Sequence, residues 1–309
     1  MNNLKKIGLT ALGTALVATT GHAADFSVSG STAITYVSQS GNVKSKWSQG
    51  DSITFTTSGE MDNGMSVTYK YEIDDGATGA KMVTVSNDLG SLQFAGMDNS
   101  GPISAWDDLT PTANEEAHGT GVGGVGTVDG AANGQGSDDV FILNMNLMDG
   151  MDLLASYAPS LGTTRIEGSM EYGIKYTGID GLALYAAMGE NKNAANEADN
   201  TNLAAVYTMG AMSVGIQSNS TDFGTGTADE DFSAIGLSYA VSDDLSVSVN
   251  SSTVSYEDGD KEDQEAAGVS FSYTSGGLTV SGSTSSINNV AGTPTNDDDG
   301  FELNFKFAY

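Results

Sequence analysis

The chain has 309 residues, with 40 acidic against 11 basic residues and a formal net charge of −29 at pH 7. It has no cysteine, which excludes disulfide bonds and thiolate-bound metals, and its strong negative charge disfavours nucleic acid as a partner. Its 40 glycines and many Ser, Thr, Val and Tyr residues favour turns and strands over long helices, so the predicted class is all-β.

Residues 1–23 have the pattern of a secretory signal peptide. Lys5 and Lys6 precede the apolar run 7–17, and Gly21 and Ala23 supply the small residues that cleavage needs. We therefore expect residues 24–309 to form one exported domain. No later stretch approaches the ~20 apolar residues of a membrane-spanning helix, whereas strands of ~9 to 11 residues with alternating polarity are compatible with a membrane.

Tight turns divide the rest of the chain into strands. Turn sequences rich in Asp, Asn and Gly begin at Met61, Asn87, Met148, Ile179, Met209, Ser242 and Ser275. These residue types suit hairpins, and two barrel strands with a turn and a longer loop take roughly 30 residues, which is about the interval between most of the turns. With a first strand over 26–38 and a last one over 301–309, the turns predict sixteen strands.

The strands alternate between apolar and polar side chains, which predicts that one face of the sheet is apolar and the other is polar and in contact with water. The last strand shows this best, and the chain ends there on an aromatic, a feature typical of outer-membrane barrels. Four tyrosines on the apolar parity precede short turns and suit a membrane interface: Tyr176, Tyr207, Tyr239 and Tyr273. The alternative is that they are core residues of a soluble sandwich.

Side chains on the polar parity, predicted to face inward, are Lys70, Glu72, Gln93, Asn144, Asn146, Glu171, Lys175, Glu302 and Lys306.

A single long segment, 97–137, interrupts the pattern between the fifth and sixth strands. A loop of this length is generally functional or disordered. It contains no lysine or arginine. Its acidic residues include Asp98, Asp107, Asp108, Glu115, Glu116 and Asp129.

The leader, sixteen alternating strands, short turns and aromatic end together resemble the general diffusion porins of Gram-negative outer membranes. The resemblance implies a transmembrane antiparallel β-barrel whose third loop, 97–137, folds into the lumen and narrows a pore for small hydrophilic solutes and ions. It also implies a homotrimer in outer-membrane lipid, an assembly machinery that reads Phe305, Phe307 and Tyr309, and the bases Lys70 and Lys81 opposite the acidic loop.

Three departures from the family pattern are visible. The third loop lacks the proline-aromatic-glycine motif of some porins, and the second loop, 75–80, is too short for a latch between subunits. Tyr309 stands where phenylalanine is commoner.

The excess of acids predicts a cation-selective pore, because clusters of carboxylates attract cations over about a Debye length, ~8 Å at physiological salt. The alternative is that most acids lie on solvated outer loops. Acid clusters at 257–263 and at Asp297, Asp298 and Asp299 offer oxygen ligands to calcium, which would also bridge lipopolysaccharide. No cluster follows a calcium-loop spacing, which favours plain solvated loops.

Other functions have less support. His118 has no second histidine at metal spacing, and Gly119, Gly121 and Gly124 match a nucleotide-binding pattern without its strand-to-helix context, so neither an enzyme nor a cofactor is expected. A secreted acidic surface protein or adhesin is a second interpretation, and a substrate-specific channel is a third. The missing inward aromatic ladder favours non-specific passage over the third.

Overall fold

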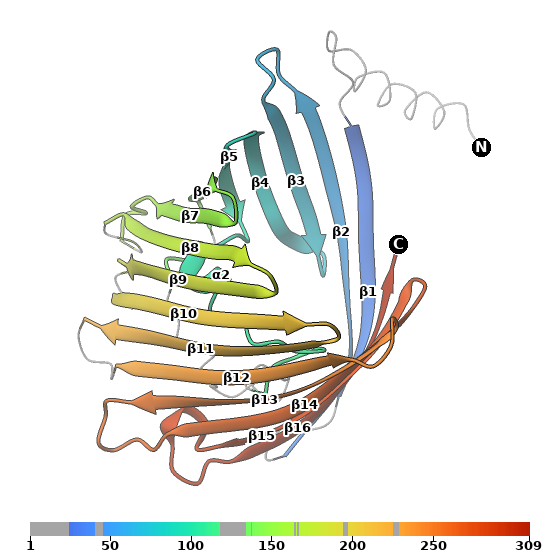
Figure 1. Ribbon diagram of the computed structural model, residues 1–309, viewed down its shortest axis with the longest axis vertical. Helices are drawn as coiled ribbons and strands as arrows, with labels where there is room; N and C mark the ends of the chain where they lie inside the picture. Colours follow the sequence, from blue (N-terminus) through green and yellow to red (C-terminus); the bar gives the residue numbers. More distant parts are fainter. Residues whose placement is uncertain are drawn as a thin grey trace.

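The computed structural model describes residues 25–40, 46–117, 134–136, 138–163, 165, 167–193, 197–224 and 229–309. In these residues, sixteen strands form one antiparallel sheet that closes into a barrel, with β1 paired to β16 (Figure 1). The strands are β1 (Asp25–Gln39), β2 (Lys46–Glu60), β3 (Ser66–Asp74), β4 (Ala77–Asn87), β5 (Gly90–Met97), β6 (Val140–Met148), β7 (Met151–Ala158), β8 (Ser169–Ile179), β9 (Leu182–Asn191), β10 (Ala198–Met209), β11 (Met212–Phe223), β12 (Glu230–Ala240), β13 (Leu245–Tyr256), β14 (Gln264–Ser275), β15 (Leu278–Asn288) and β16 (Asp298–Ala308). The predicted strand number and order are confirmed.

The short turns lie where the sequence placed them. Strands β6 and β7, and likewise β8 and β9, are separated by two residues, and the second of these is Gly150 or Gly181. Both glycines have positive φ, 71° and 73°, the backbone conformation that two-residue hairpins need and that side chains with a Cβ disfavour.

The connection between β3 and β4 is shorter than the predicted second loop, 75–80. Only Asp75 and Gly76 lie outside the strands, with φ of 47° and 80°. Two consecutive residues with positive φ are typical of a type I′ hairpin. The remaining residues of the expected loop belong to β4.

The two faces of the sheet differ as the alternation predicted. Val249 pairs with Leu237 on β12 and Val269 on β14, whereas its neighbour Ser248 pairs with Ser238 and Ser270. Val249 is 51% exposed, as are many other apolar side chains of its parity. The barrel therefore has an apolar outer face. Within the described residues, no helix is both long and apolar enough to cross a membrane.

The four tyrosines of the predicted girdle lie on this outer face. Tyr207, Tyr239 and Tyr273 are exposed near the short turns of β10, β12 and β14, and Tyr176 has the same place in β8. Tyr239 pairs with Met212 and Val247, which continue the apolar surface. Their position is confirmed, and their contact with a membrane interface stays a prediction.

Pairing of the chain ends closes the barrel. The backbone N–H of Gly30 donates to the carbonyl of Tyr309 at 2.9 Å, and the N–H of Tyr309 donates to the carbonyl of Gly30 at 3.0 Å. At the other end of the seam, Gln39 and Ser40 donate to Asp298. Both edges of the sheet are thereby satisfied, which removes the exposed edges of an open sheet.

Candidate functional site

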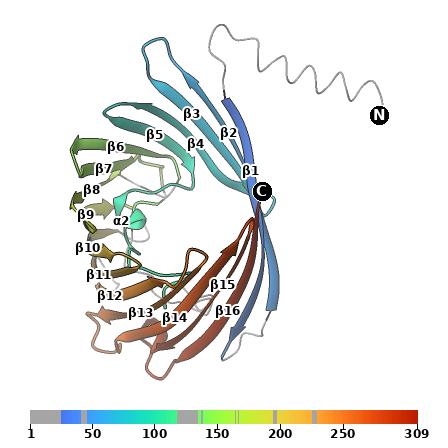
Figure 2. The ribbon, with the colours of Figure 1, turned by 45° about the vertical axis from the view of Figure 1, so that its right-hand side comes forward.

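The segment that follows β5 lies inside the barrel. Its short helix α2 (Pro102–Ala105) is enclosed by the ring of strands in Figure 2. Asn99 begins the path by donating to Gln93 on the inner face of β5, at 2.5 Å. From there residues 98–117 contact the polar parity of successive strands as far as β15, which identifies that parity as the inner wall.

The first anchor of the segment is Ile103, which is fully buried. Its backbone N–H donates to Glu171 on β8 at 3.1 Å, and its carbonyl accepts from Asn202 on β10 at 2.6 Å. Glu171 and Asn202 are themselves 1% and 2% exposed. The segment is thus tied down by side chains that reach it from the wall.

The middle of the segment rests on two amides of β11. Gln217 donates to the carbonyl of Trp106 at 2.8 Å and accepts from the N–H of Leu109 at 2.7 Å, while Asn219 donates to the carbonyl of Asp107 at 2.9 Å. These amides satisfy backbone groups that have no strand partner. The indole of Trp106 packs edge-on against Tyr185 of β9, with ring centroids 5.4 Å apart.

The last described part of the segment crosses β13 to β15. The N–H of Ala113 donates to Ser248 and that of Asn114 to Ser270, at 2.9 and 3.1 Å. The N–H of Ala117 donates to Asn250 at 2.9 Å. Ala117 also packs in a small apolar cluster with Ala266, Ile287 and Val290, the last from the helical turn η2 (Val290–Gly292). Neutral hydroxyls and amides, with little charge, hold this stretch.

The returning end of the segment is also tied to the wall. The N–H of Gln135 donates to Glu171 at 2.7 Å, and its carbonyl accepts from the guanidinium of Arg165 at 3.1 Å. Arg165 also donates to the carbonyl of Pro159 at 2.7 Å. Burial lowers the pKa of Arg165 from its usual value, and the nearby carboxylates of Asp139 and Asp138 oppose that shift.

Glycines on the inner parity allow the segment to lie directly against the wall. A Cβ on Gly236 would come 2.8 Å from Thr110, and one on Gly268 would come 3.1 Å from Ala117. Gly215, which pairs with Gly236, faces Pro111 in the same way. Sequence reasoning missed these glycines and the amides of β10 and β11. The signal that could have identified them is that they occupy inward-facing positions of long strands.

The acids of the segment differ in exposure. Asp108 is exposed, whereas Glu116 is 9% exposed. Burial, and after it the neighbouring Asp108 carboxyl group, raise the pKa of Glu116 to about 9. Glu116 is therefore neutral at pH 7. The carbonyl of Glu115 accepts from Thr112 at 2.9 Å, which fixes the turn that carries these acids.

Asp98, another predicted member of the acidic cluster, has a different setting. Asp98 is exposed directly after β5, where its N–H lies 3.4 Å from a carboxylate oxygen of Asp138. It therefore lies at the base of the segment, near the end of the wall. Asp129 and His118 lie outside the described residues.

Most of the predicted inward charges lie on the inner parity. Lys70 forms an ion pair with Glu72 at 3.1 Å. The ammonium of Lys175 lies 5.6 Å from the centre of the Tyr185 ring. The remaining residues on the inner parity are Asn144 and Asn146, which pair with Leu154 and Asp152; Glu302, which accepts from Asn304; and Lys306, which pairs with Ala33 and Thr279.

The prediction for Lys81 is wrong. Lys81 pairs with Tyr71 of the outer parity, and it shares its parity with Val83, which is 41% exposed on the outer face. Register shifts beside Lys81 in both of its ladders mark irregular pairing there. The alternation of β4 through Val83 and Val85 gives Lys81 the same apolar parity, so the strand pattern does not support the inward position that the resemblance implied. Lys70 therefore lacks the neighbour that the resemblance implied.

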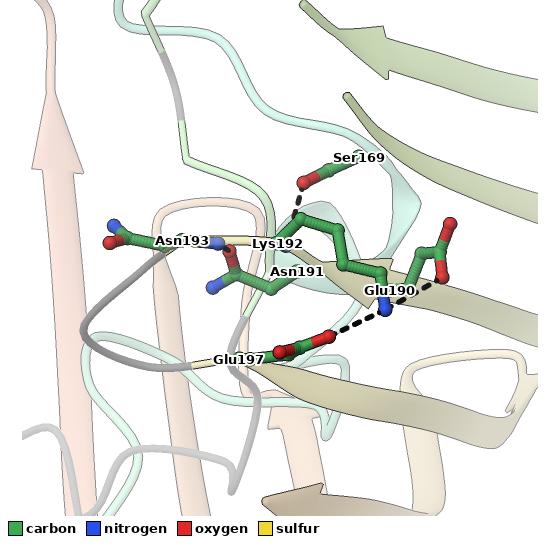
Figure 3. A network of polar contacts seen from close by, with 6 residues as sticks. All are labelled: Ser169, Glu190, Asn191, Lys192, Asn193 and Glu197. Atoms are coloured by element: carbon green, nitrogen blue, oxygen red, sulfur yellow. Dashed lines mark hydrogen bonds and ion pairs between the residues drawn. The ribbon is translucent and has the colours of Figure 1, made fainter. Parts of the chain in front are cut away.

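One further ionic network lies in the connection between β9 and β10. The ammonium of Lys192 pairs with Glu197 at 2.8 Å and with Glu190 at 3.2 Å (Figure 3). Its backbone N–H donates to Ser169 at 2.8 Å. The two carboxylates raise the pKa of Lys192 above its usual value. The network joins the ends of β8, β9 and β10.

Two of the three aspartates considered for calcium, Asp297 and Asp298, have separate partners. Asp297 accepts from the N–H of Asn289 at 3.1 Å, and Asp298 accepts from Ser40 at 3.0 Å across the closing seam. Among the described residues, no group of three acidic or histidine side chains is arranged to hold a metal ion. Calcium binding here stays a prediction.

Comparisons with known proteins agree on one family. A family model described as Gram-negative porin matches residues 10–266. No curated protein matches the chain by sequence.

Solved structures share the fold at low sequence identity. An anion-selective porin from Comamonas acidovorans is 13% identical, with a TM-score of 0.71 over 93% of this chain and 100% of that one. OmpT of Vibrio cholerae in its trimer form is 14% identical, with a TM-score of 0.69 over 93% and 99%. A mutant porin of Rh. blastica is 16% identical, with a TM-score of 0.65 over 92% and 100%. The family match and the closed barrel together establish an outer-membrane channel, and the chain belongs to the Gram-negative porin family.

Proposed function

We propose that this porin lets small hydrophilic solutes and ions diffuse passively through the barrel, with a preference for cations. The observation that carries the proposal is the course of residues 98–117, which lie along the inner wall from β5 to β15 and bring acids into the interior. Segment 97–137 contains no lysine or arginine to offset these acids. A carboxylate-bearing constriction attracts cations and repels anions.

The strength of the preference follows from which acids remain charged. Glu72 is paired with Lys70, and Glu171 is buried beneath the segment. Glu116, with its pKa raised to about 9, is neutral at pH 7. Asp108 and Asp98 are exposed, and of the two only Asp108 lies away from the base of the segment. A moderate preference is therefore expected, weaker than the net charge of the whole chain suggests.

The barrel fold does not decide the sign of selectivity. The Comamonas acidovorans structure with the same fold is described as anion-selective. Because the fold is shared and the sequences are only 13% identical, inner side chains are the expected source of selectivity. In this chain those of the segment are acidic.

Reversal potentials in a planar bilayer test the proposal. Purified protein under a tenfold KCl gradient should show a reversal potential of the sign that cation passage gives, and D108N should reduce its size. D62N, a control in the turn between β2 and β3, should leave it unchanged. A potential of the anion-preferring sign would overturn the proposed selectivity while leaving the channel function intact.

We also propose a homotrimer, supported by the trimer form of the structurally similar OmpT and by the broad apolar outer face. The second loop has only two residues outside the strands, so subunits would associate through their walls. Single-channel recordings of a trimer should show current steps that close in groups of three. In the same proposal, Phe305, Phe307 and Tyr309 form the signal for the assembly machinery.

A further inference from the structure

A single carboxylate holds both ends of the segment that lines the pore. Glu171 on β8 accepts the N–H of Ile103 on one oxygen, at 3.1 Å, and the N–H of Gln135 on the other, at 2.7 Å. The two donors are far apart in the sequence, yet they meet at one side chain. The path between them is therefore closed into a loop at its base.

Each of the two residues is held a second time through its carbonyl. Asn202 donates to the carbonyl of Ile103 at 2.6 Å, and Arg165 donates to that of Gln135 at 3.1 Å. Arg165 is the only arginine of the sequence, and it is 7% exposed. Its planar guanidinium serves two backbone carbonyls, of Pro159 and Gln135.

The surroundings of Glu171 are built to admit the segment. Gly101 and Gly134 approach its carboxylate so closely that a Cβ on either would contact an oxygen of Glu171. Gly189, across from Glu171 on β9, leaves room for its stem. A buried carboxylate is costly unless several donors satisfy it. Backbone pairing with β7 and β9 already holds β8 in the barrel. Closing the barrel therefore does not require a buried carboxylate at this position.

We propose that Glu171, assisted by Arg165, is the positioning residue that fixes the base of segment 97–137 against the inner wall and thereby keeps the pore at one steady width. The proposal rests on the constriction role given to this segment under the proposed function. It assigns Glu171 to placing the segment, and it assigns ion selectivity to the exposed acids.

E171Q removes one acceptor and sets an amide group against a backbone N–H. Leaving a buried backbone N–H without an acceptor costs enough to change an equilibrium roughly tenfold or more. The population of detached segments should rise by about that factor. In single-channel records this appears as added fluctuation between current levels, with a higher mean conductance.

E302Q is the matched control. Glu302 also lies on the inner wall and is 8% exposed, and its carboxylate accepts from Asn304 of its own strand. Both variants replace an inner-wall carboxyl group with an amide, but only E171Q unties the segment. E302Q should therefore keep the steady current level of the parent protein.

A second readout does not depend on conduction. The chain has 2 tryptophans, Trp47 on the outer wall and Trp106 within the segment. In a W47F parent, the fluorescence anisotropy of Trp106 reports how firmly the segment is held. E171Q should lower it and increase quenching by acrylamide, and E302Q should not.

The combined outcomes are decisive. Unchanged anisotropy and unchanged current fluctuation in E171Q would overturn the proposal. If the parent fails to conduct, the proposed function fails, but the Trp106 readout still tests the positioning role. R165Q, which loses the guanidinium at Gln135, should show the same changes as E171Q in smaller degree, and it replaces E171Q if that variant does not fold.

Discussion

At the scale of the residue, burial decides which acids bring charge into the pore. Glu116 and Asp108 belong to the same segment, but Glu116 is buried while Asp108 is exposed. Removal from water disfavours the ionised form, and the second carboxylate nearby disfavours it further. A count of acids in the sequence therefore overstates the negative charge of the interior at neutral pH.

This difference predicts a pH-dependent selectivity. Because the pKa of Glu116 is raised to about 9, its carboxyl gains a negative charge as the pH rises from 8 to 10, and cation preference should increase. One charge about 8 Å away in water favours a cation and disfavours an anion by roughly 0.5 kcal/mol each, so the cation-to-anion ratio should rise by up to about sixfold, and by less where salt screens the charge. Reversal potentials at both pH values measure the change.

E116Q is the control for that measurement. It keeps a neutral hydrogen-bonding side chain at the site and cannot ionise, so its selectivity should change much less between pH 8 and 10. An equal rise in both proteins would assign the effect to groups other than Glu116.

At the scale of the element, each strand serves two environments. In β12, Leu237 lies on the outer face and pairs with Val214 and Val249, while Ser238 pairs with Ser213 and Ser248. Consecutive residues thus face different surroundings although they share one backbone. A substitution has very different costs at two neighbouring positions.

L237R and S238R test this division. An arginine that faces lipid costs roughly 2–4 kcal/mol near the bilayer centre and less towards its surfaces, whereas an inward arginine remains in water. We expect L237R to lower the free energy of unfolding by roughly 2 kcal/mol, and S238R to change it little. Urea unfolding of protein folded into lipid vesicles measures both. Equal losses in the two variants would contradict the assigned faces.

At the scale of the whole molecule, the barrel and its inner segment are separate structures. Every strand pair lies outside residues 98–137, and β1 closes the sheet with β16. The described residues of the segment, 98–117 and 134–136, are attached through side chains of the wall and contribute no strand. The wall should therefore stay closed when part of the segment is removed.

Replacing 110–134 by a linker tests this view. Leu109 is bound at β11 and Gln135 at β8, three strand spacings or roughly 14 Å apart, which about six Gly and Ser residues span. Single-channel conductance should rise because the interior loses a constricting segment, while circular dichroism should retain its strand signal. Unchanged conductance would mean that 110–134 does not narrow the pore.

The sequence by itself determined the strands and their faces. Alternation and turn chemistry act between residues that are close in the chain, so the turns, the sixteen strands and the bounds of the long segment were predictable. The same local rule placed Lys70 and Glu171 on the inner wall. The inward position of Lys81 came from the resemblance, and it was wrong because Lys81 shares the apolar parity of Val83, which is exposed on the outer face.

Only the tertiary structure decided where the long segment runs and which residues hold it. Ile103 and Glu171 are separated by 68 residues, and Ala113 and Ser248 by 135. Such contacts exist only once the closed wall brings β8 and β13 around the same interior. The burial of Glu116 and the meeting of two chain segments at Glu171 follow from that closure, which no local pattern of residues records.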